Sequence, residues 1–490
     1  MWDAETEQSA SNCDSGWTVM NSLIARQSFC GPWSSNFGGH ALMSLGQAHL
    51  ESIAAKHGVA LKDCVPASDS ERLAQLKLLL ADQNVPYPIS PDVGERYYNL
   101  AASGQPFGVG SLSDDSVDLG DYANFQNYER YTLEEHLSWA CLVSDQQKTK
   151  LRYACREYLE GEKTFQIGGS VIPDYYILNA RIFQQTGWQL STVNMIIPAE
   201  LFFTCHSRQF FPVTTFMRPL EQDYLQEPDI GHDVAGHVAT FTIPAVAHVM
   251  RNHGLARDLI YAERDELSRA AKSDEQRQTI ARWADELLLY AGRIYWFTVE
   301  FGLVMQAGEV RDFGAGILSS PGETRYSIDS TESNRILIDP SCDKDLLRLA
   351  TTDYLISEYQ KTYFVMKSFE QLESLTPERI IQAAKTAQHL PHYTWREIVP
   401  GDEVLNVGSI AIGSNEKYLR LMAGLPLDEC LTRAAIRNLR IITQHPAKFR
   451  EFAGAFEVAP PEVPEKIVEW FRGADARGEF PQDILPLNME

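Results

Sequence analysis

The sequence has few of the features that mark a nucleic-acid-binding, membrane or secreted protein. Its 490 residues include 43 Lys and Arg against 66 Asp and Glu, which gives a formal net charge of −23. Binding to nucleic acid or to an anionic membrane requires clustered positive charge, so we expect neither partner. No apolar run reaches the ~18–20 residues of a membrane span without a charge, and the acidic, polar start is unlike a secretory signal.

Cysteine-based sites and the common catalytic motifs are also missing. The eight cysteines are scattered and form no CxxC pair, which argues against a zinc ribbon and a disulfide framework. We interpret them as reduced thiols and expect a cytoplasmic protein. The sequence contains no GxGxxG, no P-loop, no GxSxG and no HExxH, which excludes the sites that these motifs mark.

The pattern of apolar residues is mainly that of helices, and the length suits two or three domains. We therefore predict a mainly α (α+β) fold in three parts. Residues 1–120 form a largely helical N-terminal extension, residues 121–375 a helical catalytic domain with short β segments, and residues 376–490 a helical C-terminal extension. No internal repeat divides the chain further.

Local patterns predict individual elements within these parts. Residues 282–305 carry apolar side chains on nearly every face, which indicates a buried helix, whereas the charged residues 256–286 indicate a helical piece facing solvent. We also expect helices at 70–81 and 430–445, strands at 188–197 and 211–217, a polar linker at 111–122 and a loop at 394–409.

Two histidines five residues apart, His232 and His237, stand in the segment LQEPDIGHDVAGHV. Five residues rotate an α-helix by about 140°, so the rings converge only if His232 lies in its first turn. Asp229 just before it is a candidate N-cap, which favours such a start. The spacing alone is a weak signal, because His248 and His253 repeat it in what resembles an ordinary helix surface.

Glu300 is a more specific signal, because it stands in the apolar segment RIYWFTVEFGLVM. A carboxylate there costs several kcal/mol unless it is paired or binds a cation. One interpretation is a buried ion pair with an arginine. The other is a metal site in which His232, His237 and Glu300 form the two-histidine, one-carboxylate triad of non-haem Fe(II) oxygenases, although three such ligands also suit catalytic zinc.

At these residues the sequence resembles the pterin-dependent aromatic amino acid hydroxylases, nearest the bacterial phenylalanine 4-hydroxylases. The resemblance runs from about Tyr128 to Phe369, roughly half of the chain. It rests on nine collinear blocks: YTLEEHLSWACL, TGWQL, MIIPAELFF, FFPVTTFMRP, DYLQEPDIGHDVAGHV, IYWFTVEFGL, FGAGILSSPGE, ESNRILID and YQKTYFVMKSF. The fold that it implies is the helical catalytic core of that family.

The resemblance implies an enzyme with Fe(II) and a tetrahydropterin, tetrahydrobiopterin or a related one, as cofactors. The family's iron ligands fall on His232, His237 and Glu300. Its reaction divides O2 between an aromatic amino acid and the pterin, so the implied partners are O2 and an aromatic amino acid. The natural pterin, the oligomeric state and the roles of both extensions stay open.

The resemblance also assigns roles around the iron. Phe202 matches the aromatic residue that stacks on the pterin, and Ile197, Asp233 and Tyr295 lie near the family's pterin contacts. Arg218 matches the arginine that holds the substrate carboxylate, a task that suits a planar, bidentate guanidinium. Further matches are Trp296 and Phe301 in the substrate pocket, Ser319 beside the substrate and the first histidine, and Asp229 as an orienting partner.

Two positions favour phenylalanine as the substrate. Trp296 resembles phenylalanine and tyrosine hydroxylases, since tryptophan hydroxylases tend to have a phenylalanine there. Ile356 stands where tyrosine hydroxylases have an aspartate, and an apolar side chain leaves a phenol without a polar partner. Hydroxylation of tryptophan, of tyrosine or at another ring position remains an alternative, as do, more remotely, a zinc hydrolase and a non-catalytic scaffold.

The sequence also departs from the family. Gly231 and Ala235 are small where bacterial relatives have large aromatic residues, so we expect a wider pocket. One residue is missing between Arg218 and Tyr224. His237 and Glu300 stand 63 positions apart, which is longer than usual, and the charged residues 256–286 account for the insertion. These departures suggest a specialised relative, as in secondary metabolism.

Overall fold

The structure, a computed structural model, describes residues 46–103, 111–113, 115–220, 228–354, 358–399, 401–408 and 472–479. The chain divides into two units. The first, His40–Arg396 with Glu403–Ile410, carries all the described candidate site residues. Of the second, Met1–Gly39 with Glu397–Asp402 and Ala411–Glu490, the structure describes only 397–399, 401–402 and 472–479. The predicted helix at 430–445 lies outside the described residues.

Three helices confirm the helical prediction for the described part of the N-terminal extension: α2 (Gln47–His57), α3 (Asp69–Ala81) and α4 (Pro91–Ala101). Ser68 is the N-cap of α3, and its side chain forms a capping box with Glu71. Both α3 and α4 pack on α7 (Tyr175–Thr186), in one apolar cluster that includes Leu76, Leu80, Tyr97, Leu112 and Ile177.

The predicted linker at 111–122 packs against the core at Leu112. Its side chain is 3% exposed in the cluster shared with α7. Its backbone N–H donates to the side-chain oxygen of Gln189. Because the residues around this leucine are polar, the sequence pattern is that of a linker, although Leu112 packs against the core.

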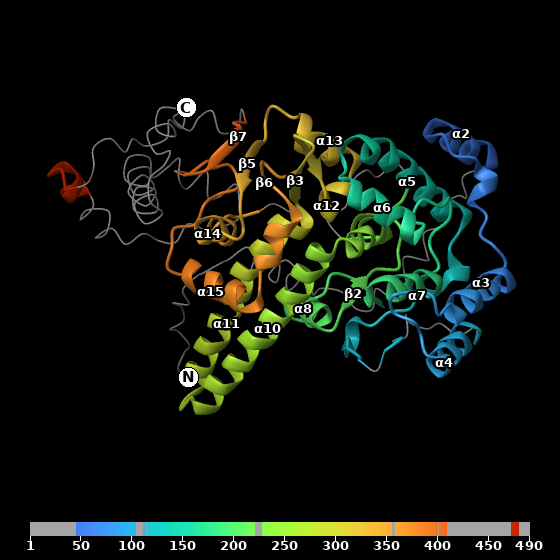
Figure 1. Cartoon of the computed structure of the whole chain (residues 1–490), viewed down its shortest axis with the longest axis horizontal. Coiled ribbons are helices and arrows are strands. Elements are labelled where there is room, and N and C mark those ends of the chain that lie inside the picture. Colours follow the sequence, from blue (N-terminus) through green and yellow to red (C-terminus); the bar gives the residue numbers. More distant parts are fainter. Residues whose placement is uncertain are drawn as a thin grey trace, which may run out of the picture. The chain divides into compact units, whose positions relative to one another are not determined.

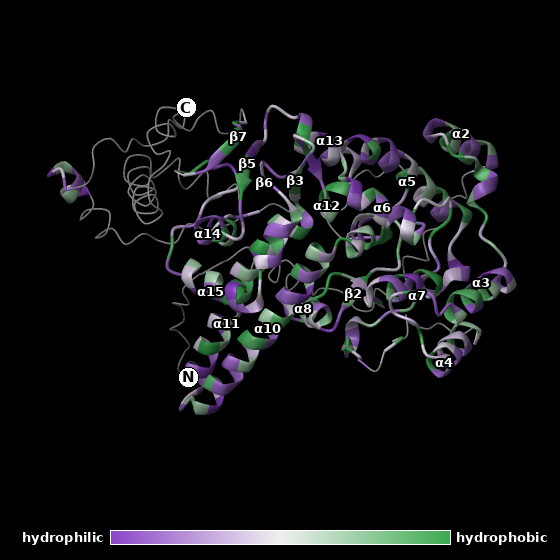
Figure 2. Cartoon of the chain, in the orientation of Figure 1, coloured by the Kyte–Doolittle hydropathy of each residue, from purple (hydrophilic) through white to green (hydrophobic). Residues whose placement is uncertain are grey.

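Helices form most of the core. They include α5 (Leu133–Tyr153), α6 (Arg156–Phe165), α8 (Ala199–Ser207), α10 (Pro244–Ala270) and α11 (Asp274–Tyr295). α10 and α11 lie side by side as a hairpin whose outer end projects from its neighbours (Figure 1). The charged segment 256–286 is thus two helices, which separate at Ser273, the N-cap of α11. Most positions of the outer end are polar (Figure 2), as expected for a solvent-facing piece.

Two small sheets complete this unit. β1 (Gln189–Thr192) pairs in parallel with β2 (Phe210–Val213), which confirms a strand at both predicted places, each shorter than predicted. The second sheet has the order β4-β3-β6-β5-β7. Its strands are β3 (Gly302–Gln306), β4 (Glu309–Asp312), β5 (Asn334–Ile338), β6 (Thr362–Met366) and β7 (Glu403–Asn406).

Two predictions are wrong at this second sheet. The helix expected over 282–305 gives way to β3 at Gly302, because those apolar residues pair with β4 and the buried β6. The loop expected over 394–409 contains β7, which pairs antiparallel with β5. A short apolar segment does not itself reveal that it will find a strand partner far away in the sequence.

The remaining elements complete the described part of the chain. They are η2 (Leu61–Cys64), η3 (Gly120–Tyr122), η4 (Tyr128–Arg130), α9 (Ile230–His232), η5 (Asp233–His237), η6 (Val238–Thr242), η7 (Trp296–Glu300), α12 (Ala315–Leu318), α13 (Pro321–Asp329), α14 (Asp343–Ala350), η8 (Phe369–Ser374) and α15 (Pro377–Ala387). α15 packs against α10, α11 and α14. Within the described ranges, no helix has the length and apolar character needed to cross a bilayer.

Candidate functional site

The two histidines of the candidate metal site lie on a backbone that changes its helical type. Asp229 caps α9, since its side chain accepts from the His232 N–H, and His232 thus lies in a first helical turn as predicted. The next five residues, Asp233–His237, form a π-helix. A π-helix bonds residue i to i+5, so it brings residues five apart nearer to one face than an α-helix does. The rings of His232 and His237 are 5.1 Å apart.

The carboxylate reaches the same place from another π-helical turn. Glu300 is the last residue of η7, which extends α11 before the chain enters β3. Two glycines allow α12 to approach both turns: a Cβ at Gly236 would lie 2.7 Å from the Ala315 carbonyl oxygen, and a Cβ at Gly316 3.1 Å from Glu300 Oε2. The segment FGAGILSS therefore packs directly on the three candidate ligands.

His232, His237 and Glu300 converge with their ligand atoms facing one another, all within 4.8 Å. His237 Nε2 lies 3.0 Å from Glu300 Oε1 and 3.3 Å from His232 Nε2, and His232 Nε2 lies 3.9 Å from Glu300 Oε2. Bonds of about 2.1 Å to one metal ion separate neighbouring ligand atoms by about 3 Å. Among the described residues, this is the one group of three or more His, Cys, Asp or Glu that could hold a metal ion.

Hydrogen bonding prepares His232 as a metal ligand. The hydroxyl of Ser319 donates its single proton to the Gly316 carbonyl, at 2.8 Å. Its oxygen, 3.1 Å from His232 Nδ1, must then accept the proton of that nitrogen. His232 Nε2 is left with a lone pair that points at the other two candidate ligands, which is the tautomer that binds a metal.

Burial and charge also suit a cation here. Burial lowers the pKa of His232 to about 4, so the ring is neutral near pH 7. Burial alone would raise the pKa of Glu300, but His237 and His232 outweigh it and hold that pKa below its ordinary value. Glu300 Oε2 and His237 Nδ1 are buried without a hydrogen-bond partner. A neutral imidazole and an ionised carboxylate oxygen left without a donor fit a metal ion.

Arg218 lies beside this centre in a fixed orientation. Its Nε and Nη2 donate to the two oxygens of Asp229, at 2.8 and 2.6 Å, and both side chains are buried. The same carboxylate caps the turn that carries His232. Asp229 thus links the guanidinium predicted to bind a carboxylate to the predicted metal site.

Of the residues predicted near a pterin, Phe202 and Tyr295 are in contact with each other. Phe202 is half-buried on α8, and its ring lies 4.2 Å from that of His206 and edge-on to Tyr295 at 5.7 Å. Ile197 is buried just before α8. Asp233 accepts from the N–H and hydroxyl of Thr214, both at 2.7 Å, and burial outweighs these bonds to raise its pKa to about 7.

The residues predicted for the substrate ring form an aromatic stack. Trp296 stacks on Phe301 and on Tyr354, with ring centroids 6.1 and 5.1 Å apart. Ile356 lies outside the described residues. The space beside Gly231 is filled, because a Cβ there would lie 2.3 Å from Leu142 Cδ2. Leu142 occupies the space that a larger residue at this position would need. The wider pocket expected from Gly231 and Ala235 stays a prediction.

Comparison with known proteins identifies the family. The family described as "Biopterin-dependent aromatic amino acid hydroxylase" matches residues 124–273 and 279–389, which is more than half of the chain. A phenylalanine-4-hydroxylase of Chromobacterium violaceum is 34% identical over 60% of this chain and 90% of its own length. The chain belongs to this family. The predictions of a non-haem iron monooxygenase, of iron and tetrahydropterin as cofactors, and of the fold are thereby confirmed.

Other relatives and solved structures agree with this assignment. A phenylalanine-4-hydroxylase of Ralstonia nicotianae is 35% identical over 59% of this chain and 84% of its own length. The Chromobacterium violaceum enzyme with bound Fe(III) has a TM-score of 0.50 to this structure at 34% identity, covering 59% of this chain and 96% of its own. Its structure with iron and phenylalanine has a TM-score of 0.50 at 32% identity, covering 60% and 97%.

Several residues that contact the hydroxylase site were not predicted from the sequence. Tyr354 stacks on Trp296, His206 accepts from Tyr295, and Lys150 bonds to the turn between the two histidines. His206 stands one helical turn after Phe202, which is a signal that the sequence contains. His253 was expected on a surface, but it is 1% exposed and packs on Tyr295, because the inner end of α10 is covered by α8.

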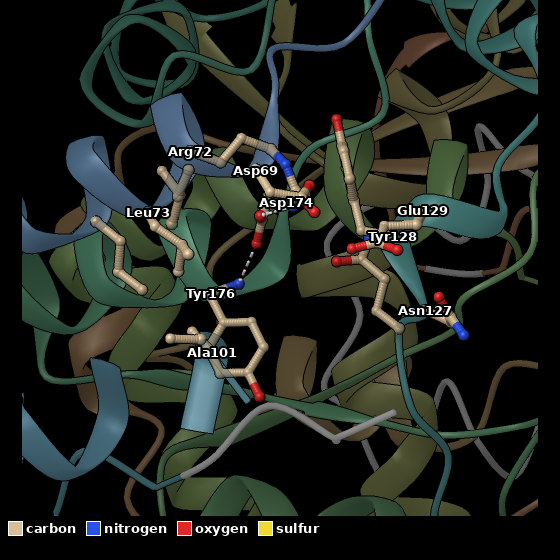
Figure 3. Close-up of a pocket in the computed structure, with 13 residues that line it drawn as sticks. Asp69, Arg72, Leu73, Ala101, Asn127, Tyr128, Glu129, Asp174 and Tyr176 are labelled. Atoms are coloured by element: carbon tan, nitrogen blue, oxygen red, sulfur yellow. Dashed lines mark hydrogen bonds and ion pairs between the residues drawn. The ribbon is translucent and has the colours of Figure 1, made fainter. Parts of the chain in front are cut away.

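A separate polar pocket lies where α3 meets the start of α7 (Figure 3). It contains none of the predicted site residues. Arg72 lies 4.2 Å above the Tyr128 ring and pairs with Asp69 and Asp174. Asp174 also caps α7 by accepting from the Tyr176 N–H. The guanidinium therefore serves to join the N-terminal helices to the hydroxylase core.

Proposed function

We propose that this protein hydroxylates the ring of L-phenylalanine to give tyrosine. In the proposed reaction one oxygen atom of O2 enters the ring and the other is taken by the tetrahydropterin. The observation that carries the proposal is the convergence of His232, His237 and Glu300 within 4.8 Å, with Ser319 fixing the tautomer of His232. The relatives named as phenylalanine-4-hydroxylases, each matched over more than four fifths of its length, support phenylalanine as the substrate.

The proposed metal site binds Fe(II) through the two imidazoles and the carboxylate of this triad. Such a triad leaves coordination positions open, and iron bound there supplies O2 activation with electrons from the tetrahydropterin. The protein supplies the binding geometry. Because Glu300 lies at the end of a buried π-turn and His232 is held by Ser319, two of the three ligands need little rearrangement on binding.

The remaining site residues then bind and orient the organic reactants. Arg218, already held by both oxygens of Asp229, binds the substrate carboxylate. Trp296 and Phe301 contact the substrate ring, and Phe202 stacks on the pterin with Ile197, Asp233 and Tyr295 nearby. Ile356 belongs to the same proposal as the apolar residue that favours phenylalanine over tyrosine.

We also propose a cytoplasmic location. The reaction requires iron as Fe(II) and a pterin that is re-reduced after each turnover, and the cytoplasm is a reducing compartment. The three-part division at residues 120 and 375, and a specialised role in secondary metabolism, stay predictions. Neither changes the chemistry of the central site.

A reconstituted assay tests the function. Protein loaded with Fe(II) receives tetrahydrobiopterin and O2, with phenylalanine, tyrosine or tryptophan, and the products are separated by ring position. We expect tyrosine from phenylalanine at a rate that requires the pterin. Tight zinc binding without pterin-dependent O2 uptake would support a hydrolase instead, and a hydroxylated tryptophan would reassign the substrate.

The variant His237→Ala tests the ligand assignment. It removes one of three ligands from a preformed site, so we expect loss of iron from the purified protein together with loss of turnover. Circular dichroism and the thermal midpoint of the apo-protein serve as the control for folding. Full activity of a folded His237→Ala protein would refute the proposed triad.

A further inference from the structure

A buried lysine bonds to the turn between the two histidines of the proposed metal site. Lys150 on α5 is 1% exposed, and its amine has three hydrogen-bond acceptors. They are Glu162 Oε1 at 2.7 Å, Gln146 Oε1 at 3.2 Å and the backbone oxygen of Ala235 at 2.6 Å. An ammonium group has three protons, so each has an acceptor.

The first arm of this network ends on the π-helical turn. Ala235 is the third residue of Asp233–His237 and lies between the two ligating histidines. Its carbonyl also accepts from the hydroxyl of Tyr158, at 2.5 Å, and that hydroxyl lies 3.0 Å from the next carbonyl oxygen, of Gly236. Two side-chain donors from α5 and α6 therefore hold the turn at the point where it departs from α-helical geometry.

The second arm ends on the residue that orients His232. Gln146 accepts from Lys150 through Oε1 and donates through Nε2 to the backbone oxygen of Ser319, at 2.8 Å. Ser319 in turn accepts from His232 Nδ1 through its hydroxyl oxygen. Lys150 is thus connected to the His232–His237 turn directly and to the orienting serine through one amide.

A contribution to folding stability does not by itself explain a buried lysine at this position. Burial lowers the pKa of the Lys150 amine and the Glu162 carboxylate opposes this, so a charge at this position carries a desolvation penalty. An apolar side chain of similar volume often stabilises such a position equally well or better. What an apolar side chain lacks is a set of directed donors. One of the Lys150 donors ends on the backbone of the His232–His237 turn, and another bonds to the amide of Gln146, which in turn holds the backbone of Ser319.

We propose that Lys150 is a positioning residue for the metal centre, holding the His232–His237 turn through the Ala235 carbonyl and the orienting Ser319 through Gln146. This rests on the proposed function, because it requires that His232, His237 and Glu300 bind the metal. Residues that orient metal ligands in this way typically change metal affinity 10–100-fold when they are replaced.

Binding of Co(II) to the apo-protein tests this without any turnover. Co(II) has visible absorption bands that report both affinity and coordination geometry, and a relative has been crystallised with cobalt. The main variant is Lys150→Met combined with Glu162→Gln, which keeps the aliphatic stem and leaves no unpaired charge. We expect its dissociation constant for Co(II) to rise 10–100-fold, with altered band positions.

The controls separate positioning from general stability. Asn179→Leu is the matched variant, since Asn179 is also fully buried and accepts from the Leu190 N–H, but on α7 and β1. We expect lower stability and unchanged Co(II) affinity. Equal weakening by Asn179→Leu would overturn the proposal, as would an unchanged dissociation constant and spectrum in the folded lysine variant.

A third variant covers the case in which the double variant does not fold. Gln146→Met removes only the arm to Ser319 and leaves the Lys150–Glu162 pair in place. We expect several-fold weaker Co(II) binding, and unchanged binding would overturn the proposal. Absence of Co(II) binding by the wild-type protein would instead refute the proposed metal site itself.

Discussion

At the scale of single residues, the side of the site that carries Phe202 depends on a buried histidine–tyrosine pair. His206 Nδ1 lies 2.7 Å from the Phe202 carbonyl, which only accepts, so this nitrogen carries the proton. Nε2 then accepts from the Tyr295 hydroxyl, at 3.2 Å. Burial lowers the pKa of His206 to about 3, which keeps the ring in this neutral form. The pair fixes both a predicted pterin-stacking segment and a predicted pterin contact.

Replacing His206 by Leu should leave the buried Tyr295 hydroxyl without its acceptor. We expect a loss of about 1–3 kcal/mol in the free energy of unfolding, measured by urea denaturation of the apo-protein. The double variant His206→Leu/Tyr295→Phe removes both polar partners and should recover part of this loss. A double variant whose loss equals the sum of the two single losses would show that the pair is not coupled.

Arg218→Lys tests the predicted carboxylate clamp. Lysine keeps the charge but loses the planar, bidentate fork that Asp229 now orients. We expect kcat/KM for phenylalanine to fall about 10–100-fold, mainly through KM, while Co(II) affinity stays within about threefold. Arg208→Lys, at a position 42% exposed on its side chain, is the control. A fall confined to kcat would instead place Arg218 in the chemical step.

At the scale of elements, the sequence predicts the regular parts of the site better than the irregular ones. The apolar residues from 282 onward correctly indicated a buried helix as far as Tyr295, and the Asp229 cap correctly placed His232 in a first turn. The π-helical turns at His237 and Glu300 were not predicted, because a change from i+4 to i+5 bonding leaves no mark in apolar spacing. β7 was missed because its partner β5 lies about 70 residues earlier.

The resemblance to a known family supplied roles that no local pattern contains, such as that of Phe202. It gave no role to the residues of α5 that bond to the histidine turn and to Ser319. Lys150 and Gln146 look like ordinary surface residues in the sequence of α5, yet both are 1% exposed. Their burial follows from the packing of α5 against the histidine turn and α13, which is tertiary information.

The helical hairpin of α10 and α11 allows a test of whether its outer end supports the metal site. Its outer end, residues 266–280, is largely exposed, whereas the inner ends carry His253 and Tyr295. Replacing 267–279 by a short Gly-Ser turn should change the free energy of unfolding by no more than about 1 kcal/mol and leave Co(II) affinity unchanged. Loss of Co(II) binding in the shortened protein would show that the insertion supports the site.

At the scale of the whole molecule, buried histidines and buried carboxyl groups change the free energy of unfolding with pH in opposite directions. Burial lowers the pKa of His136, His253 and His392 to about 4 and that of His206 to about 3. These rings are neutral when folded and charged when unfolded below pH ~6.5, so the unfolded chain binds more protons. Stability from these histidines is therefore lost as pH falls from about 6.5 towards 4.

Buried carboxyls have the opposite effect. Burial raises the pKa of Glu323 and Asp233 to about 7 and that of Asp312 well above its ordinary value. These groups stay protonated in the folded protein, while the unfolded chain ionises them above pH ~4.5. The folded state then binds more protons, so their contribution falls as pH rises. Together the two sets predict maximal stability of the apo-protein between about pH 6 and 7.

The variant Glu323→Gln tests how much one buried carboxyl group contributes to the predicted fall in stability as pH rises. Glu323 Oε1 accepts from the Tyr363 hydroxyl at 2.9 Å and the Gln360 N–H at 3.1 Å, and a glutamine oxygen accepts both bonds without ionising. The wild type should lose on the order of 3 kcal/mol relative to this variant between pH 4.5 and 8, measured by urea denaturation of the apo-proteins at each pH. Glu373→Gln, at an exposed position, is the control, and its difference from the wild type should stay flat. A flat difference for Glu323→Gln would mean that this carboxyl is ionised in the folded protein, and the stability maximum should then lie at higher pH.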